Sequence, residues 1–160
     1  MLSEYLVKNG VRLDPKTRKK WHLLGELTRS YCGMELSEEV HDQILETILV
    51  REMRVSTGLG GGVAIPHART NVVLKTGVMF VRFKEGIEWD SMDGSLVNFL
   101  FLVIGPTAST EEYLFVLSKI SKLLSRKSNR ADLLAATDEK EVTEIISGVR
   151  DREGLRQSRG

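Results

Sequence analysis

The most apolar run of the chain reads Leu-Val-Asn-Phe-Leu-Phe-Leu-Val-Ile over residues 96–104. Side chains of an extended strand alternate between two faces, and here both faces are apolar except at Asn98. Such a run is typical of a central strand that is covered on both sides. It is far shorter than the roughly 18 apolar residues that a membrane helix needs. We therefore expect a buried sheet and no membrane span.

Helical patterns lie on both sides of the strand region. Trp21, Leu24, Leu27 and Tyr31 recur at helical spacing between the capping pair Asp14-Pro15 and Gly33. Ser37 is expected to cap a second helix that runs to about Met53. Residues 77–83 read as a further strand, and two more helices are predicted at residues 110–124 and after Asp138. Helices, then strands, then helices again favour an α/β fold in which helices cover both faces of a sheet.

Composition excludes several classes of protein. The chain has 160 residues, 23 basic and 22 acidic side chains and a formal net charge of +1. A balanced charge makes nucleic-acid binding a poor first hypothesis. The N-terminus has no apolar segment of signal-peptide length, and Cys32 is the only cysteine, so no internal disulfide can form. We expect a single domain in the cytoplasm.

Arg51 is an unusual member of the second helix. The apolar stripe of this helix continues from Ile44 and Ile48 to position 51, where an always-charged guanidinium replaces the expected apolar side chain. Arg51 therefore needs an anionic partner or access to solvent.

A glycine-rich segment follows this helix and reads Ser56-Thr57-Gly58-Leu59-Gly60-Gly61-Gly62. It has the wrong spacing and context for a dinucleotide loop, and no lysine follows to make a P-loop. The amides of such a loop can nevertheless form a concavity for an anion, with the two hydroxyls as extra donors. His67 lies five residues beyond Gly62 and directly after Pro66. Together these residues predict a nucleophilic imidazole beside a phosphate cradle, although a histidine after a proline is more often a simple turn residue.

No metal or cofactor is expected. His22, His41, His67 and Cys32 show no paired ligand spacing on one element. We interpret the first two histidines as partly exposed helix residues and Cys32 as a small packing residue.

Several motifs together resemble a known family. The pair Arg51-Glu52, the stretch from Ser56 through Ala-Ile-Pro-His to Arg69, Trp89, Asp93-Gly94 and residues 100–106 are similar to the Enzyme IIA domain of the fructose/mannitol class of the bacterial phosphotransferase system. The resemblance covers residues 1–149 and leaves a polar tail at residues 150–160. It implies a three-layer fold with a mixed sheet of about five strands between helical layers.

The resemblance also implies a function and a set of site residues. Members of the family accept a phosphoryl group from the carrier HPr on the histidine that corresponds to His67, and pass it to a cysteine of a IIB domain. The arginine that steadies the phosphate corresponds to Arg51. The donors of the glycine-rich segment described above, Ser56, Thr57 and the glycines at 58, 60, 61 and 62, are the other expected phosphate ligands, together with Tyr113.

One residue departs from the family pattern. A second histidine usually begins the helix after the proline loop, and this chain has Tyr113-Leu114 there. Tyrosine can donate a hydrogen bond to a phosphate but does not become a cation near neutral pH. The site therefore lacks one positive charge and one proton shuttle.

Three functions remain open at this point. The favoured one is a standalone, nitrogen-type regulatory IIA protein that HPr or a nitrogen-branch HPr-like carrier phosphorylates on His67. The alternatives are a binding module that has lost phosphotransfer, and a sugar-branch IIA that serves a separate IIB. The expected partners are the carrier and either IIB or a regulatory target protein; whether the chain forms a homodimer is left open.

Overall fold

A mixed six-stranded sheet forms the centre of the computed structural model, which describes residues 1–33 and 36–148. The strands lie in the order β1-β5-β6-β3-β2, and β4 also pairs with β6. Their bounds are β1 Leu6–Leu13, β2 Gly58–Gly60, β3 Val63–Ala64, β4 His67–Thr70, β5 Gly77–Ile87 and β6 Val97–Pro106. The predicted central strand is confirmed, because β6 pairs with β5 on one side and with β3 and β4 on the other.

The sheet is mixed because its members run in both directions. β5 and β6 are antiparallel, whereas β1 is parallel to β5, and both β3 and β4 are parallel to β6. Six strands are present where about five were expected, and β1 was not foreseen. The glycine-rich segment is a tight hairpin of β2 and β3 instead of an open loop. Gly60, Gly61 and Gly62 have positive φ angles of 93°, 63° and 82° at its turn, a conformation that side chains other than glycine rarely adopt.

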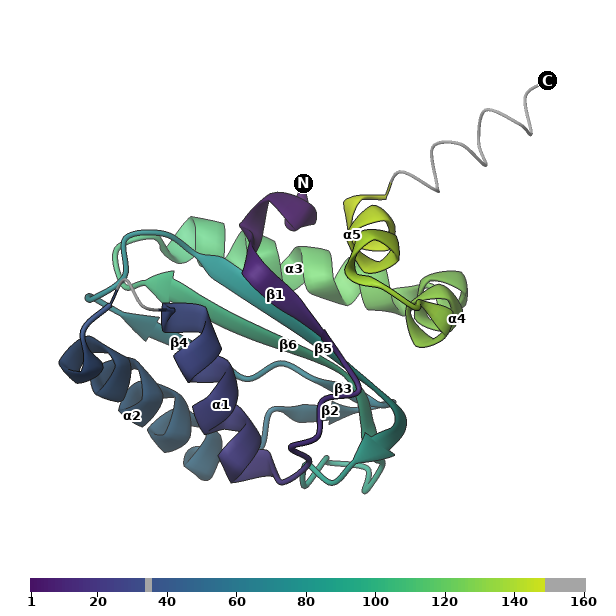
Figure 1. Cartoon of the computed structure of the whole chain (residues 1–160), viewed down its shortest axis with the longest axis horizontal. Helices are drawn as coiled ribbons and strands as arrows, with labels where there is room; N and C mark the ends of the chain where they lie inside the picture. Colours follow the sequence, from purple (N-terminus) through teal and green to yellow (C-terminus); the bar gives the residue numbers. More distant parts are fainter. Residues whose placement is uncertain (34–35, 149–160) are drawn as a thin grey trace.

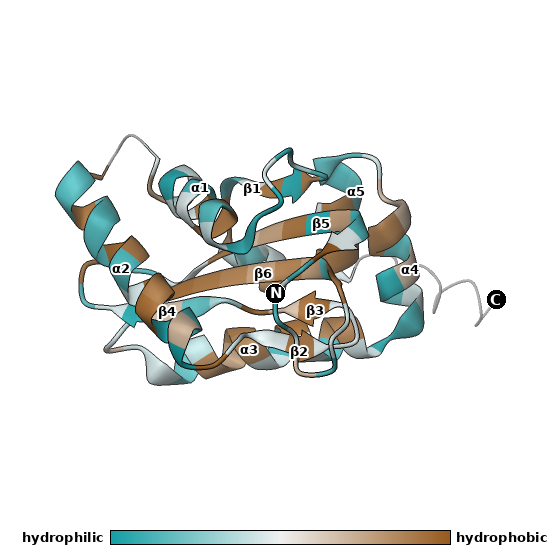
Figure 2. Cartoon of the chain, turned by 90° about the horizontal axis from the view of Figure 1, so that it is seen from below, coloured by the Kyte–Doolittle hydropathy of each residue, from teal (hydrophilic) through white to brown (hydrophobic). Residues whose placement is uncertain are grey.

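Helices cover both faces of the sheet (Figure 1). The helical elements are η1 Leu2–Tyr5, α1 Lys20–Cys32, α2 Glu38–Arg54, α3 Thr110–Ser125, α4 Lys127–Ala135 and α5 Glu139–Ser147. α1 and α2 pack on one face through Leu24, Ile44 and Ile48, and α3 to α5 pack on the other. Alternate residues of β6 enter the two cores: Leu100 and Leu102 face α1 and α2, while Phe99, Phe101 and Val103 face α3. The predicted layers are therefore confirmed, and Figure 2 shows the apolar colour continuing along β5 and β6.

Two predicted features of α1 are wrong. The helix begins at Lys20 and not after Asp14, whose backbone has a positive φ of 48°. Asp14 is held elsewhere, because its carboxylate accepts hydrogen bonds from Arg82 Nη2 and from the amide of Lys84, each at 2.8 Å. Trp21 was predicted to face inward but is 46% exposed.

The other predicted helices agree with the structure. Ser37 caps α2 by accepting a hydrogen bond from the amide of Val40 at 3.2 Å, and Asp138 caps α5 by accepting one from the amide of Glu141 at 2.8 Å. Cys32 is buried, as expected of a packing residue. The predicted tail at residues 150–160 lies outside the described residues. Within the described ranges, no helix has both the length and the apolar character that crossing a bilayer requires.

Candidate functional site

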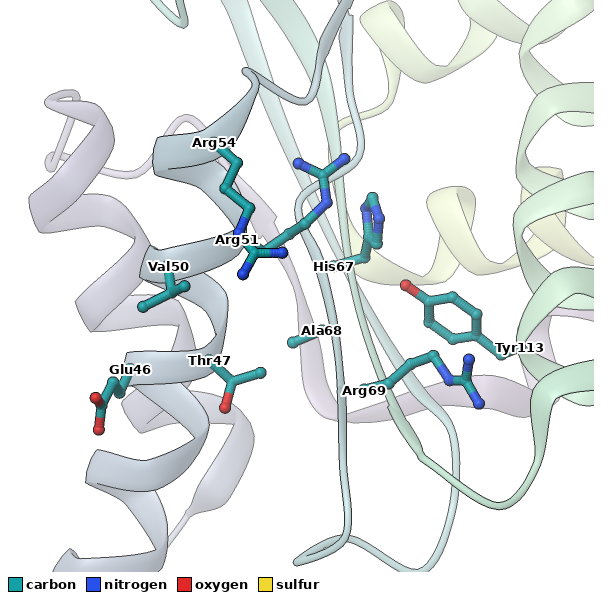
Figure 3. A pocket seen from close by; sticks show the side chains of 9 residues that line it. All are labelled: Glu46, Thr47, Val50, Arg51, Arg54, His67, Ala68, Arg69 and Tyr113. Carbon is teal, nitrogen blue, oxygen red and sulfur yellow. The ribbon is translucent and has the colours of Figure 1, made fainter.

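His67 is the first residue of β4, a short strand on the outer side of β6. Ala68 and Thr70 are buried, whereas His67 and Arg69 are half-buried on the opposite face of β4. This alternation follows from strand geometry, which places residues i and i+2 on the same face. His67 and Arg69 therefore project together from the sheet, between α2 and α3 (Figure 3).

A cavity of about 500 Å³ opens at this position. It is lined by residues of α2, β4 and α3, namely Glu46, Thr47, Val50, Arg51, Arg54, His67, Ala68, Arg69 and Tyr113. The α2 members fall one helical turn apart, at 46 and 47, then 50 and 51, then 54, so they form one stripe of the helix. The structure therefore brings together three of the predicted site residues, His67, Arg51 and Tyr113, from three different elements (Figure 3).

The imidazole of His67 is held by one backbone contact. Its Nδ1 lies 2.6 Å from the carbonyl oxygen of Ile65. Because a carbonyl can only accept a hydrogen bond, Nδ1 must carry the proton, and Nε2 keeps its lone pair. Burial lowers the pKa of His67 below the usual value, although the hydrogen bond to Ile65 opposes this, and the positive charge of Arg51 lowers the pKa further. The ring is therefore neutral and nucleophilic at neutral pH.

Arg51 lines the cavity, which explains why a charged residue continues the apolar stripe of α2. Its Nη1 donates a hydrogen bond to the carbonyl of Val55 at 2.9 Å, beyond the end of α2. Figure 3 shows the guanidinium beside the ring of His67. The position is suited to an anion bound between the two side chains.

Two further arginines line the cavity and were not singled out from the sequence. The guanidinium of Arg54 forms no hydrogen bond or ion pair with any residue that the structure describes. Arg69 donates through Nη2 to the Thr107 carbonyl and to the Thr110 hydroxyl. The signals were present: Arg54 is three residues after Arg51 on a helix, and Arg69 is two residues after His67 on a strand. The cavity thus holds three permanent positive charges.

Tyr113 occupies the α3 side of the cavity. It is only 5% exposed, and its ring centroid lies 6.0 Å from that of His67. Its hydroxyl is directed toward His67 (Figure 3). Burial raises the pKa of Tyr113 to about 12, and Arg51 and Arg69 oppose that rise with their positive charges. The hydroxyl therefore remains a neutral donor throughout the physiological range.

Ser56 and Thr57 lie outside the cavity, contrary to the predicted phosphate cradle. The Thr57 amide and hydroxyl both donate to the carboxylate of Glu52, at 2.9 and 2.6 Å. The hydroxyl of Ser56 donates to the carbonyl of Trp89 at 2.8 Å. Both residues are therefore already hydrogen-bonded within the fold and connect the end of α2 to the segment before β6.

The glycines of the β2–β3 hairpin are also absent from the cavity wall. The Gly61 amide donates to Asp93, and the Gly58 amide to the hydroxyl of Ser56. A Cβ at Gly58 would come within 2.6 Å of Ser91, and one at Gly60 within 2.8 Å of Asp93. One at Gly62 would meet Asn98 at 2.9 Å. These glycines allow close packing, and the structure does not bring their amides together with His67.

One cluster has the composition of a metal site. Ligand atoms of Glu38, His41 and Asp42 on α2 lie within 4.8 Å of one another. Glu38 already pairs with Arg29 at 3.0 Å, and His41 Nδ1 is 3.0 Å from Asp42. The cluster is separate from the cavity and carries no functional argument. His41 is buried, in contrast to the partly exposed position that the sequence suggested, whereas His22 is exposed.

Comparisons with known proteins agree with this architecture. Residues 4–149 match the model of the family described as "Phosphoenolpyruvate-dependent sugar phosphotransferase system, EIIA 2". A nitrogen regulatory protein of Klebsiella oxytoca is 32% identical over 148 residues, which cover 92% of this chain and 88% of that protein. The fructose-specific EIIABC component of Bacillus subtilis is 31% identical, and the match covers 91% of this chain but only 23% of that longer protein.

A solved structure also matches closely. The crystal structure of nitrogen regulatory protein IIA-Ntr from Neisseria meningitidis superposes with a TM-score of 0.81 at 35% identity. The match covers 91% of this chain and 98% of the other. The resemblance inferred from the sequence motifs is thereby confirmed, as is the α/β fold that it implied.

Proposed function

This chain belongs to the EIIA 2 family of the phosphoenolpyruvate-dependent sugar phosphotransferase system, and from this premise we propose that it carries a phosphoryl group on Nε2 of His67. The observation that carries the proposal is the hydrogen bond between His67 Nδ1 and the Ile65 carbonyl. It fixes the tautomer and leaves the other ring nitrogen unprotonated in a cavity with three arginines. This is the arrangement that a neutral nitrogen nucleophile requires.

The transfer step follows from this geometry. The lone pair of Nε2 attacks the phosphorus of a phosphohistidine on an HPr-like carrier, and the phosphorus–nitrogen bond to the carrier breaks as the new one forms. The His67 ring becomes cationic, and its Nδ1 proton stays in the hydrogen bond to Ile65. Arg51 neutralises charge on the phosphoryl oxygens in the transition state, and the hydroxyl of Tyr113 donates a hydrogen bond to the group after transfer.

Within the family, we infer a nitrogen-type regulatory role. The nitrogen regulatory proteins of Klebsiella oxytoca and Neisseria meningitidis are 32% and 35% identical to this chain, and the matches cover 88% and 98% of those proteins. The phosphorylation state of His67 would then be read by a regulatory protein. Delivery to a IIB cysteine is the sugar-branch alternative, and transfer of label from His67 to such a cysteine would favour it.

Tyr113 supports a second candidate function, a binding module without phosphotransfer. A tyrosine cannot supply the cation that a second histidine would provide. The geometry favours phosphotransfer over this alternative, because three arginines already supply positive charge to the cavity and the Tyr113 hydroxyl faces His67.

The deciding experiment is reconstitution of the phosphorylation chain. The protein is incubated with Enzyme I, HPr or its nitrogen-branch counterpart, and labelled phosphoenolpyruvate. We expect an acid-labile phosphate on His67. Absence of label from every cognate donor would overturn the proposal and favour the binding module.

Arg51→Ala should slow phosphoryl uptake by about tenfold to hundredfold, because the lost guanidinium acts mainly on the charge of the transition state. The unfolding free energy should change by less than about 1 kcal/mol, since Arg51 makes one hydrogen bond at a partly exposed helix end. Rapid-quench uptake kinetics and denaturant titration measure the two effects. Arg29→Ala, which removes an exposed arginine from α1, is the matched control and should leave uptake unchanged.

The pH dependence of uptake should report His67 alone. The pKa of His67 is lowered, so the pH must fall below the ordinary value of about 6.5 before Nε2 is protonated and loses its lone pair. The rate should therefore be flat from about pH 7 to pH 9 and decrease only on the acidic side. Using a pre-phosphorylated carrier limits the contribution of earlier steps. An NMR titration of the His67 ring that gives a pKa above 6.5 would contradict the expectation.

A further inference from the structure

The Tyr113 hydroxyl is a cavity-facing polar group that has no hydrogen-bond partner among the described residues. The side chain is only 5% exposed, yet the hydroxyl makes no hydrogen bond within the part of the chain that the structure describes. It points into the cavity toward His67 (Figure 3). Because this donor is unpaired and faces the cavity, it is placed to meet a group that enters the cavity.

Arg69 is the residue that contacts the Tyr113 ring. The centre of its guanidinium lies 5.7 Å from the ring centroid, within the range of a cation–π contact. Figure 3 shows the two side chains next to each other on the side of the ring away from Arg51. Arg69 thus approaches the aromatic ring, while the hydroxyl extends from that ring toward His67.

The position of the Arg69 guanidinium is fixed by α3. Its Nη2 donates both to the carbonyl of Thr107, just before the helix, and to the hydroxyl of Thr110, its first residue. Arg69 Nε is buried and has no partner among the described residues. Arg51, and not Arg69, is among the charges that shift the pKa of His67, whereas Arg69 contacts the Tyr113 ring. The influence of Arg69 on the reaction is therefore expected to pass through Tyr113.

We propose that Arg69 is a positioning residue, which holds the Tyr113 ring so that its hydroxyl donates a hydrogen bond to the phosphoryl group on His67. This inference rests on the proposed phosphorylation of His67 and extends it to a residue outside the phosphate contacts. The pair of side chains takes the place of a second histidine: tyrosine supplies the donor and arginine supplies a fixed positive charge.

The charge of Arg69 should also strengthen the donor. A cation near the ring stabilises the tyrosinate form, and Arg69 is one of the two charges that lower the pKa of Tyr113 against the effect of burial. A more acidic hydroxyl donates a stronger hydrogen bond to an anionic acceptor. Because neither an arginine nor this tyrosine titrates near neutral pH, the pair works without a protonation step.

A double-mutant cycle in the full chain tests whether Arg69 acts through Tyr113. Tyr113→Phe should slow phosphoryl uptake by about tenfold, the loss expected for one hydrogen bond to a charged group. Arg69→Gln should slow it by about threefold to tenfold in the wild-type background. In the Tyr113→Phe background, Arg69→Gln should have no further effect, because the hydroxyl that it positions is already gone.

Arg54→Gln is the matched control, because it removes another cavity arginine that makes no aromatic contact with Tyr113. Its effect on uptake should be the same in both backgrounds. Thr110→Val is the second variant: it keeps both side chains of the pair but removes one anchor of Arg69, and it should give a smaller loss than Arg69→Gln. Thermal melts establish whether each variant is folded. If Arg69→Gln does not fold, Thr110→Val still tests the inference.

A spectroscopic measurement separates positioning from simple stabilisation of α3. The NMR signals of isotope-labelled Tyr113 should shift on phosphorylation of the wild type, and this shift should be reduced in Arg69→Gln. If the wild type takes up no phosphoryl group, the proposed function itself fails. If the wild type is phosphorylated but Arg69→Gln is equally costly with and without the Tyr113 hydroxyl, only the inference about Arg69 is overturned.

Discussion

His67→Ala should fold like the wild type and take up no phosphoryl group from any carrier. Uptake should fall below detection, at least a thousandfold, because removal of a nucleophile abolishes the covalent step. Among the side chains that line the cavity, His67 alone offers an unprotonated nitrogen at neutral pH. The arginines are permanently protonated, and the pKa of Tyr113 of about 12 keeps its hydroxyl neutral.

The stability of this variant should change little. His67 is half-buried at the edge of an open cavity, and its ring is hydrogen-bonded to the carbonyl of Ile65. We expect the unfolding free energy to change by about 1 kcal/mol or less, as measured by denaturant titration. A complete loss of uptake in a folded protein would therefore report chemistry and not unfolding.

The other two histidines provide matched controls. The chain has three in total, and the remaining two are the exposed His22 on α1 and the buried His41 on α2. His22→Gln should retain full uptake, and a phosphorylated sample should release its label in acid as a phosphohistidine does. Label that persists in His67→Ala would place the acceptor on a different residue and would contradict the proposed function.

Much of the fold could be predicted because the residues that determine it are close in sequence. The continuous apolar run at residues 96–104 indicates a strand that is buried on both faces, and β6 is that strand. The caps at Ser37 and Asp138 act within three residues, so a local pattern identifies them. Asp14 failed as a cap because its partner, Arg82, is 68 residues away, and a local pattern contains no information about that contact.

The candidate site could be predicted only in part, for the same reason. His67 and Arg51 were identified from a motif and from a charge on an apolar stripe. The glycine-rich segment was misinterpreted because the partners of its polar groups lie elsewhere. Trp89 accepts from Ser56 and Asp93 accepts from Gly61, and nothing in the segment itself predicts either contact. Arg69 was missed because its role depends on a contact with α3.

Glu52 shows that a motif residue beside the site can have a structural function. It follows Arg51 directly, but it is 3% exposed and faces away from the cavity, into the fold. Its carboxylate accepts from the Thr57 amide and hydroxyl and pairs with Lys20 Nζ at 2.8 Å. The Trp89 indole nitrogen donates to the same Thr57 hydroxyl at 3.2 Å. One buried carboxylate therefore connects α1, the end of α2 and the start of the β2–β3 hairpin.

Glu52→Ala should lower the free energy of unfolding by about 3–5 kcal/mol, because it leaves the buried Lys20 ammonium with only the exposed carboxylate of Asp90, 3.9 Å away. Lys20 is only 9% exposed, and the Thr57 amide and hydroxyl would lose their acceptor in the same variant. At about 2–4 °C for each kcal/mol in a chain of this size, the melting temperature should decrease by roughly 10 °C. Denaturant titration and a thermal melt measure both quantities.

The double variant Glu52→Gln with Lys20→Met distinguishes an uncompensated charge from a general packing defect. Glutamine keeps the shape of the carboxylate, and methionine keeps most of the length of the lysine without its charge. If the buried charge dominates, the double variant should be more stable than Glu52→Gln alone, and the two effects should not add. Glu46→Gln, an exposed change on the same helix, should alter stability by less than about 0.5 kcal/mol. Additive losses in the double variant would show that the ion pair is not the source of the destabilisation.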